Sequence, residues 1–286
     1  MNATEAPLLA NKHYVNPSVF LPENLLREAR RQKSVPKGHV PTICILDPDG
    51  DLVAYLRTLE RVRTCKSWPC YHTDLHEFEY EGFLYGIIGC AVGGSFAVLL
   101  AEQLFISGCE LLISITSAGQ INPHLKSPCF ILIESALRDE GTSYHYLPPS
   151  QYARLSQSLN EMLVHDFDQF SPRMERGKVW TTDAPYRETE QAIIEARAEG
   201  ILAVEMEAAS LYAFAESRKR PVVCFAHVTN QMGLIHGDFE KGENSGCKDC
   251  LRLIHRVSHC WRKSICKDRY DHFSEINTEE GEEVLE

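Results

Sequence analysis

Short apolar runs alternate along the chain with segments whose apolar residues recur at helical spacing. The runs are rich in Ile, Val and Leu and predict buried strands, because strands covered on both faces show little polar alternation. The segments between them predict helices. The predicted strands span 42–46, 111–115, 129–134, 179–182 and 221–226, and the predicted helices span 25–32, 52–61, 96–105, 150–165, 189–199 and 246–265.

One stretch departs from this alternation of strand and helix. Residues 77–80 alternate, Glu81-Gly82 makes a turn, and residues 83–88 return, so the pattern indicates an antiparallel hairpin. Strands alternating with helices, interrupted by an antiparallel insertion, predict an α/β fold with a mixed sheet and one core. We expect an N-terminal extension over residues 1–40, a single domain over 41–266 and an acidic C-terminal tail over 267–286.

Composition and charge exclude several classes of protein. The formal charge of −11 argues against nucleic-acid binding and against an anionic membrane surface. No apolar run approaches the roughly 20 residues needed to span a bilayer, and residues 1–12 lack the apolar core of a signal peptide. We therefore expect a cytoplasmic protein with free thiols.

The eleven cysteines raise the question of a metal site. Cys44, Cys90, Cys109 and Cys224 lie in apolar runs, where cysteine usually behaves as a small buried hydrophobe. A second group could be a zinc site, but its spacing fits a helix equally well, with Leu251, Ile254 and Val257 on one stripe and the cysteines and histidines spread around the helix. We expect no metal and no cofactor; the residues of this group are Cys247, Cys250, His255, His259, Cys260 and Cys266.

The segment Val204-Glu205-Met206-Glu207-Ala208-Ala209 places two carboxylates around a methionine, directly before an apolar helix. The acids could simply begin the helix, where its dipole favours negative charge. Alternatively, an extended segment would put Glu205 and Glu207 on one face and Met206 on the other. A carboxylate accepts two hydroxyl hydrogen bonds, so it suits the 2′,3′-diol of a ribose.

This segment resembles the Glu-Met-Glu signature of the nucleoside phosphorylase superfamily, which includes purine nucleoside phosphorylase, uridine phosphorylase and methylthioadenosine nucleosidase. The resemblance covers residues 40–262 and includes further motifs in the same order. It implies a three-layer α/β/α sandwich with a mixed central β-sheet, a small-molecule nucleoside as substrate and a homo-oligomer. It also implies that Glu207 holds the ribose hydroxyls with Met206 against the sugar and Glu205 in the same subsite.

Two small-residue segments flank one predicted helix. Gly93-Gly94-Ser95 could cradle an anion with backbone N–H groups, and Thr116-Ser117-Ala118-Gly119 follows a strand at the sheet edge where ligands of such folds bind. The resemblance implies that Gly94, Ser95 and Ser117 lie on the side of the nucleophile, and that Ala118 and Gly119 contact the base. Arg138 falls where uridine phosphorylases read Val-Arg-x-Asp-Gly, and we assign it to the nucleophile side as well.

Three residues are candidates for recognising the leaving base. The resemblance places Tyr186 and Arg187 in a loop beside the base, and Asn230 matches an asparagine of uridine phosphorylases. Adenine-releasing relatives carry an aspartate there as the acid, whereas Asn230 can only form hydrogen bonds. Asp238 could replace that acid, although we do not favour it.

The resemblance fails at the arginines that bind phosphate. Phosphorolytic members use three; here the corresponding positions are Gly50 or Asp51, the Tyr71-His72 region and Ser114, and no arginine lies between Cys65 and Arg138. Asp49 and Asp51 would repel phosphate. Methylthioadenosine nucleosidase has lost the same arginines and carries a carboxylate there as the base for water, a place that Asp51, or else Asp49, occupies here.

We therefore expect an enzyme that cleaves the N-glycosidic bond of a nucleoside with water, with Asp51, Asp49 and Asn230 as catalytic residues. The first alternative is phosphorolysis, in which phosphate is a co-substrate bound by Arg138, His72 or Ser117. The second alternative is a non-catalytic nucleoside-binding protein.

Overall fold

The structure is a computed structural model that describes residues 6–126, 129–164, 167, 170, 173–232, 238, 241 and 243–279, with side chains up to residue 266. Ten strands form one sheet. They are β1 (Ile43–Asp47), β2 (Arg63–Thr64), β3 (His76–Tyr80), β4 (Phe83–Gly89), β5 (Leu111–Gln120), β6 (Cys129–Asp139), β7 (Tyr152–Arg154), β8 (Met174–Thr182), β9 (Ile201–Glu205) and β10 (Val222–Asn230).

Seven α-helices and three short 3₁₀ helices connect these strands in the described part of the chain. The α-helices are α1 (Pro22–Lys33), α2 (Asp51–Thr58), α3 (Gly94–Ile106), α4 (Gln157–Leu163), α5 (Glu190–Ala198), α6 (Ala208–Arg218) and α7 (Cys247–Glu279). The 3₁₀ helices are η1 (Thr142–His145), η2 (Pro185–Arg187) and η3 (Glu243–Gly246).

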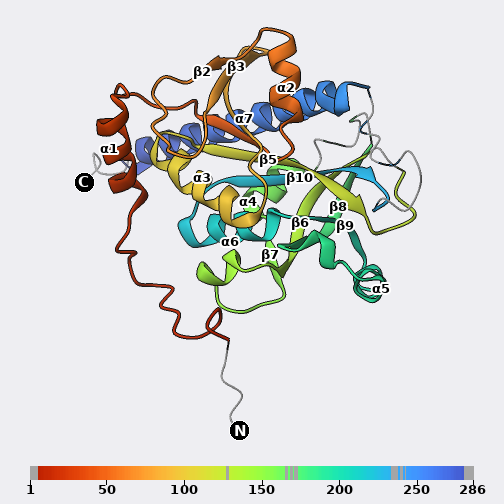
Figure 1. Cartoon of the computed structure of the whole chain (residues 1–286). Coiled ribbons are helices and arrows are strands. Elements are labelled where there is room, and N and C mark those ends of the chain that lie inside the picture. Colours follow the sequence, from red (N-terminus) through yellow and green to blue (C-terminus); the bar gives the residue numbers. More distant parts are fainter. Residues whose placement is uncertain are drawn as a thin grey trace.

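The sheet is mixed and partly closes on itself (Figure 1). Its strand order is β10-β6-β8-β9-β5-β1-β4-β3-β2, with β7 beside β6 and an additional pairing between β10 and β5. Strands β5, β10, β6, β8 and β9 therefore form a ring, while β1, β4, β3 and β2 extend from it. In the middle, β1 runs parallel to β4 and β5, and β5 runs parallel to β10. The carboxyl ends of β1, β4, β5 and β10 consequently lie at one edge.

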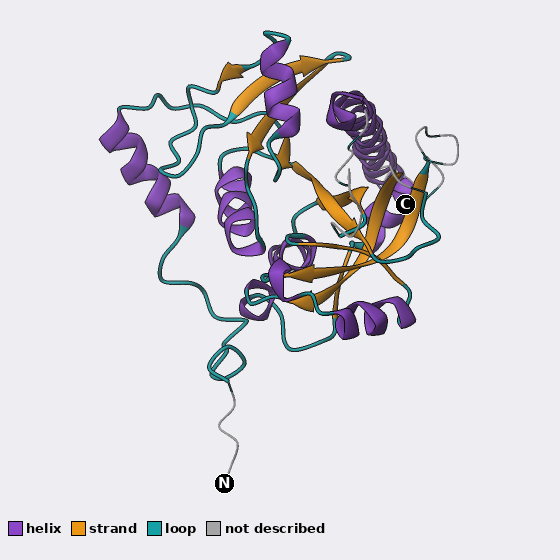
Figure 2. Cartoon of the chain, turned by 45° about the vertical axis from the view of Figure 1, so that its right-hand side comes forward, coloured by secondary structure: helices purple, strands orange, loops and turns teal. Residues whose placement is uncertain are grey.

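Helices cover both faces of the sheet (Figure 2). Helices α3 and α6 pack on each other on one side, and α7 packs against α2 and α4 on the other. Strands β1 and β10 are buried along their whole length, which agrees with their apolar sequences. The predicted α/β fold with a mixed central sheet between helical layers is confirmed.

Two predicted elements differ from the structure. Residues 116–119, expected to form a loop, continue strand β5. The helix expected over 150–165 is shorter, because β7 pairs with β6 first and the helix begins only after Ser156. The Ser156 hydroxyl accepts a hydrogen bond from the backbone of Leu159 at 3.4 Å, the arrangement that makes serine a favourable first residue before a helix.

The cysteines are all free, and nine of the eleven are buried. Leu251, Ile254 and Val257 are buried on α7, as their spacing predicted, and Cys247, Cys250 and Cys260 are buried as well. The expectation of burial was wrong for Cys90, which is exposed in the turn after β4. No group of His, Cys, Asp and Glu that could hold a metal occurs among the residues for which the structure gives positions.

The N-terminal segment is attached to the domain through α1, which packs against α3 and buries Leu26 and Ala29. Arg30 donates to the carbonyl of Ser67 at 3.1 Å, and the Tyr71 hydroxyl donates to Gln32 at 2.9 Å. Among the helices that the structure describes, none is long and apolar enough to cross a bilayer.

Candidate active site

The sheet edge at the carboxyl ends of β1, β5 and β10 carries most of the polar residues that the sequence singled out. Asp47 ends β1, and Asp49 follows it in the turn before α2. Ser117 of β5 lies beside His227 of β10 in the parallel register, and Gly119 lies beside Asn230. Strand β9 runs antiparallel to β5 and pairs Val204 with Gly119, which brings the Glu205–Glu207 segment to the same edge.

Glu205 forms the cap of helix α6. Its Oε2 accepts hydrogen bonds from the backbone of Glu207 at 2.7 Å and of Ala208 at 2.8 Å, and its Oε1 accepts one from the Thr181 hydroxyl. The two glutamates therefore do not share a face as an extended segment would require, because the chain turns into α6 directly after Glu205. Both oxygens of Glu205 are occupied by the fold, whereas Met206 stays half-buried beside it.

Glu207 is 1% exposed and only half satisfied. Its Oε1 accepts a hydrogen bond from the backbone N–H of Gly93 at 2.7 Å, so the glycine turn before α3 does bind a carboxylate, that of the protein itself. Its Oε2 has no hydrogen-bond partner in the described part of the chain. A buried acceptor without a partner costs about 1–3 kcal/mol, and a hydroxyl-bearing ligand would remove that cost.

Burial controls the ionisation of this residue. Desolvation, followed by the neighbouring charge of Glu205, raises the pKa of Glu207 to about 8, although the backbone N–H of Gly93 and the nearby Thr116 hydroxyl oppose the shift. The charge of Asp49 also raises this pKa. Desolvation likewise raises the pKa of Glu205 to about 7.

Asp49 is held by Ser117. Its Oδ2 accepts hydrogen bonds from the Ser117 backbone at 2.8 Å and from the Ser117 hydroxyl at 2.5 Å. Its Oδ1 has no hydrogen-bond partner among residues with described positions, and the side chain remains 32% exposed. Asp49 is therefore fixed beside Ser117 of β5 while part of its side chain stays accessible.

Asp51 has a different environment, because it begins helix α2 and pairs with Lys241. Lys241 Nζ lies 2.6 Å from Asp51 Oδ2 and 3.7 Å from Asp49 Oδ2. The buried Asp47 accepts a hydrogen bond from the backbone of Val53 at 2.9 Å. Desolvation, together with the charges of Asp49 and Asp51, raises the pKa of Asp47 to about 7.

We call Asp47, Asp49, Asp51 and Lys241 the acceptor side of the site. This side is negative overall. Asp49, Asp51 and Lys241 sum to one negative charge, to which ionised Asp47 would add another. The positions that hold arginines in phosphorolytic relatives offer no replacement: Gly50 adopts a left-handed φ of 79°, Ser114 is buried at 1% exposure, and Tyr71 bonds to α1. At about 4 Å and an effective dielectric constant near 20, each carboxylate would repel a phosphate charge by about 4 kcal/mol.

The residues expected to contact the base lie around Asn230. Its Nδ2 donates to the carbonyl of Ala118 at 3.5 Å, and its Oδ1 accepts a hydrogen bond from the backbone of Met232 at 3.0 Å. A Cβ on Gly119 would overlap with the sulfur of Met232 and lie 3.4 Å from Asn230 Oδ1. The Met232 side chain therefore covers Gly119, and only glycine at position 119 permits this close approach. Asp238, the alternative acid, accepts two hydrogen bonds from the backbone of Gln231 at 2.9 Å.

Other predicted site residues are not gathered with this cluster. Tyr186 in η2 is fully exposed, and Arg187 beside it is exposed as well. Arg138 is 4% exposed and fixes the segment that follows it, where its donors contact Ser143, Leu147, Pro148 and Ser150. Gly94 packs against Ser210, and Ser95 is exposed at the start of α3.

Two residues of the cluster were missed by sequence reasoning. Lys241 is 190 residues from Asp51 and belongs to no recognisable motif. His227 is buried and stacks on Phe130 with ring centroids 4.5 Å apart. Desolvation, followed by the charge of Lys241, lowers the pKa of His227 to about 4. The only sequence signal for His227 is its place in β10, three residues before Asn230.

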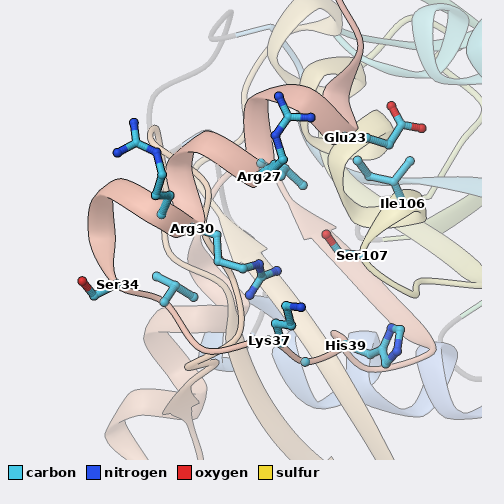
Figure 3. A pocket seen from close by; sticks show the side chains of 12 residues that line it. Glu23, Arg27, Arg30, Ser34, Lys37, His39, Ile106 and Ser107 are labelled. Carbon is cyan, nitrogen blue, oxygen red and sulfur yellow. The ribbon is translucent and has the colours of Figure 1, made fainter.

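A large cleft lies elsewhere. It has a volume of about 860 Å³ between α1 and the residues that follow α3, and Figure 3 shows Arg27, Arg30, Lys37 and His39 around it. None of the residues that line it belongs to the cluster around Asp49 and Glu207. That cluster has a much smaller cleft of its own, lined by Asp47, Asp49, Asp51, Ile115, Thr116, Ser117, His227 and Cys247.

Comparison with curated proteins gives distant relatives. The chain is 26% identical over 215 residues to a uridine phosphorylase of Thermococcus kodakarensis, covering 68% of this chain and 77% of that protein. It is 24% identical over 208 residues to a guanosine phosphorylase of Halorubrum lacusprofundi, covering 73% and 79%. An uncharacterised protein of Acanthamoeba polyphaga mimivirus is 28% identical over 158 residues, but this match spans 54% of the chain and only 60% of the viral protein.

The fold agrees with these relatives. A crystal structure of uridine phosphorylase from Vibrio fischeri ES114 superimposes with a TM-score of 0.64 at 22% identity, covering 79% of this chain and 93% of that one. A sequence profile of the Phosphorylase superfamily matches residues 42–258, from the start of β1 into α7. The chain therefore belongs to the Phosphorylase superfamily.

Proposed function

We propose that this protein is a nucleosidase, which cleaves the N-glycosidic bond of a ribonucleoside with water and releases the free base. The observation that carries the proposal is the negative acceptor side, where the nearest cation, Lys241, is already paired with Asp51 and Asp49. Water needs a base and no cation, whereas a phosphate dianion needs several positive donors.

Glu207 would hold the sugar. Its buried and unpartnered Oε2 suits a ribose hydroxyl, and its Oε1 is fixed by the backbone of Gly93. The developing positive charge on the ribosyl ring would be stabilised by the neighbouring carboxylates, because such charges act strongly in a site shielded from water.

Asp49 would act as the base. In the proposed step, the oxygen of water forms a bond to C1′ as the bond from C1′ to the base nitrogen breaks, and the water proton passes to Asp49. The free Oδ1 and partial exposure of Asp49 support this role better than the environment of Asp51, which is paired with Lys241. Asp51 as the base remains the other prediction made from the sequence. Through its contact with Lys241, Asp51 would also have an electrostatic function.

Asn230 and Gly119 would contact the base once the Met232 side chain, which covers Gly119, moves aside. Asn230 can form hydrogen bonds to the base but cannot protonate it, so a base that leaves readily as an anion fits this site better than adenine. The relatives named for uridine and guanosine leave both pyrimidines and purines as candidates.

Phosphorolysis is the second candidate, supported by the names of these relatives and by the presence of one cation, Lys241, beside Asp49 and Asp51. The test is a panel of ribonucleosides incubated in phosphate-free buffer and in buffer with inorganic phosphate, with free base measured by chromatography. The proposal predicts base release at the same rate in both, and a rate about 10²–10⁴-fold lower for Asp49→Asn. Base release that requires phosphate and saturates with it would contradict hydrolysis and favour phosphorolysis.

A further inference from the structure

Lys241 joins three parts of the chain at the acceptor side. It lies between β10 and η3, and its ammonium group is 2.6 Å from Asp51 at the start of α2 and 3.7 Å from Asp49 in the preceding turn. The thiol of Cys247, at the start of α7, lies 3.5 Å from the backbone carbonyl of Asp51 and adds a second contact between these segments. The Lys241 side chain is only 21% exposed, so its position is fixed by the fold.

The surroundings of Lys241 keep it charged. Burial by itself would lower the pKa of Lys241, but the hydrogen bond to Asp51 and the charges of Asp49, Asp51 and Asp47 outweigh it and raise that pKa. His227 on β10 faces the same group, and burial keeps it neutral near neutral pH. Lys241 is thus the cation that balances these aspartates in the described part of the site.

The groups that face this cation come from every element around it. β1 contributes Asp47, and the turn before α2 and the start of α2 contribute Asp49 and Asp51. β10 contributes His227, and Asp249 and Cys247 of α7 lie close enough to act on the same groups. Without Lys241, the carboxylates at the end of β1 would have no nearby positive charge and would take up protons more readily.

We propose that Lys241 is the positioning residue of the acceptor base: its bridge between Asp51 and Asp49 holds Asp49 in place beside Ser117 and sets a positive charge next to it. This inference rests on the proposed hydrolysis, since a protonated Asp49 cannot accept the proton of the attacking water. Lys241 touches neither the water nor the nucleoside in this role. It acts through the two aspartates.

The experiment compares the pH dependence of kcat/KM for base release in the wild-type protein and in Lys241→Met, Lys241→Gln and Lys241→Arg. In the Met and Gln variants the acidic limb should move about 1–2 pH units to higher pH, the usual effect of one nearby charge. On that limb their activity should therefore be about 10–100-fold below that of the wild type at the same pH and should largely recover near pH 9, with KM changed less than twofold. Lys241→Arg should restore the acidic limb.

Lys248→Met is the matched control, because Lys248 pairs only with the exposed Glu243 at 3.2 Å and should leave the profile unchanged. Thermal melting of each variant shows whether it is folded, and the Gln variant serves if the Met variant is not. An equal loss of activity at every pH, or an unmoved acidic limb in folded Met and Gln variants, would overturn the inference. A wild-type protein that releases no base from any nucleoside would overturn the proposed function, and this inference with it.

Discussion

Glu207 should reduce the stability of the protein while serving its function, and Glu207→Gln separates the two effects. Glutamine keeps the size of the side chain and an oxygen that can accept the hydrogen bond from Gly93. It removes the charge that burial disfavours in a residue only 1% exposed. The variant should lose activity but become more stable than the wild type at alkaline pH.

The size of the stability effect follows from the pKa of Glu207, raised from 4.5 to about 8. Between these values the unfolded chain is ionised and the folded protein is protonated, so the folded state binds more protons and stability falls as pH rises. The penalty is about 2 kcal/mol at pH 6 and about 5 kcal/mol at pH 9, at 1.36 kcal/mol per pH unit. The difference, about 2–3 kcal/mol, should be absent from Glu207→Gln.

The assay is urea unfolding of both proteins at pH 6 and pH 9, with turnover of the best nucleoside measured in parallel. The free energy of unfolding of Glu207→Gln relative to the wild type should rise by about 2–3 kcal/mol between the two pH values. Turnover should fall about 10²–10³-fold, as for the loss of one strong contact in the transition state. A stability difference that does not change with pH would refute the reasoning, and wild-type turnover would show that the sugar is held elsewhere.

Three further predictions test the surroundings of the site. Glu205→Ala removes the acceptor of two backbone N–H groups at the start of α6, so the free energy of unfolding at pH 6 should fall by about 1–3 kcal/mol. A change below about 0.5 kcal/mol would contradict the capping role of Glu205. Gly94→Ala would place its Cβ 2.7 Å from the Cβ of Ser210 and should lower the free energy of unfolding in urea by about 1–3 kcal/mol. The double variant Gly94→Ala/Ser210→Gly should recover part of this loss. Full stability of the single variant would show that α3 and α6 can move apart without cost. Extended dialysis against EDTA should leave base release unchanged, and a loss restored by zinc would contradict the expectation that no metal takes part.

The sheet and its functional edge were predictable because their signals are local. Runs such as 43–46 and 222–226 are apolar throughout, as expected for strands buried on both faces. The Glu205-Met206-Glu207 motif and the small residues of 117–119 then marked the edge where the strands end. The lack of arginines at the positions that bind phosphate in phosphorolytic relatives could also be predicted from the sequence, because it depends on residue type and not on geometry.

The electrostatics of the site were not predictable, because they depend on contacts between distant segments. Lys241 pairs with Asp51 across 190 positions, and nothing near Lys241 in the sequence indicates this contact. The different tasks of Glu205 and Glu207 depend on where the chain turns into α6, which a pattern of alternating residues cannot specify. Arg138 was expected near the nucleophile, yet its guanidinium donates hydrogen bonds to residues 143–150, in the segment that connects β6 to β7.

The central claim is that water accepts the sugar, and oxygen-18 labelling tests it most directly. The protein is incubated with its best ribonucleoside and inorganic phosphate in water enriched in oxygen-18, and the sugar product is analysed at once by mass spectrometry. Hydrolysis at a site with Asp49 as base predicts free ribose, or its 5′-modified form, with one labelled oxygen at C1. A sugar 1-phosphate whose C1 oxygen comes from unlabelled phosphate would contradict the account, and would mean that Lys241 leaves its aspartates to bind the anion.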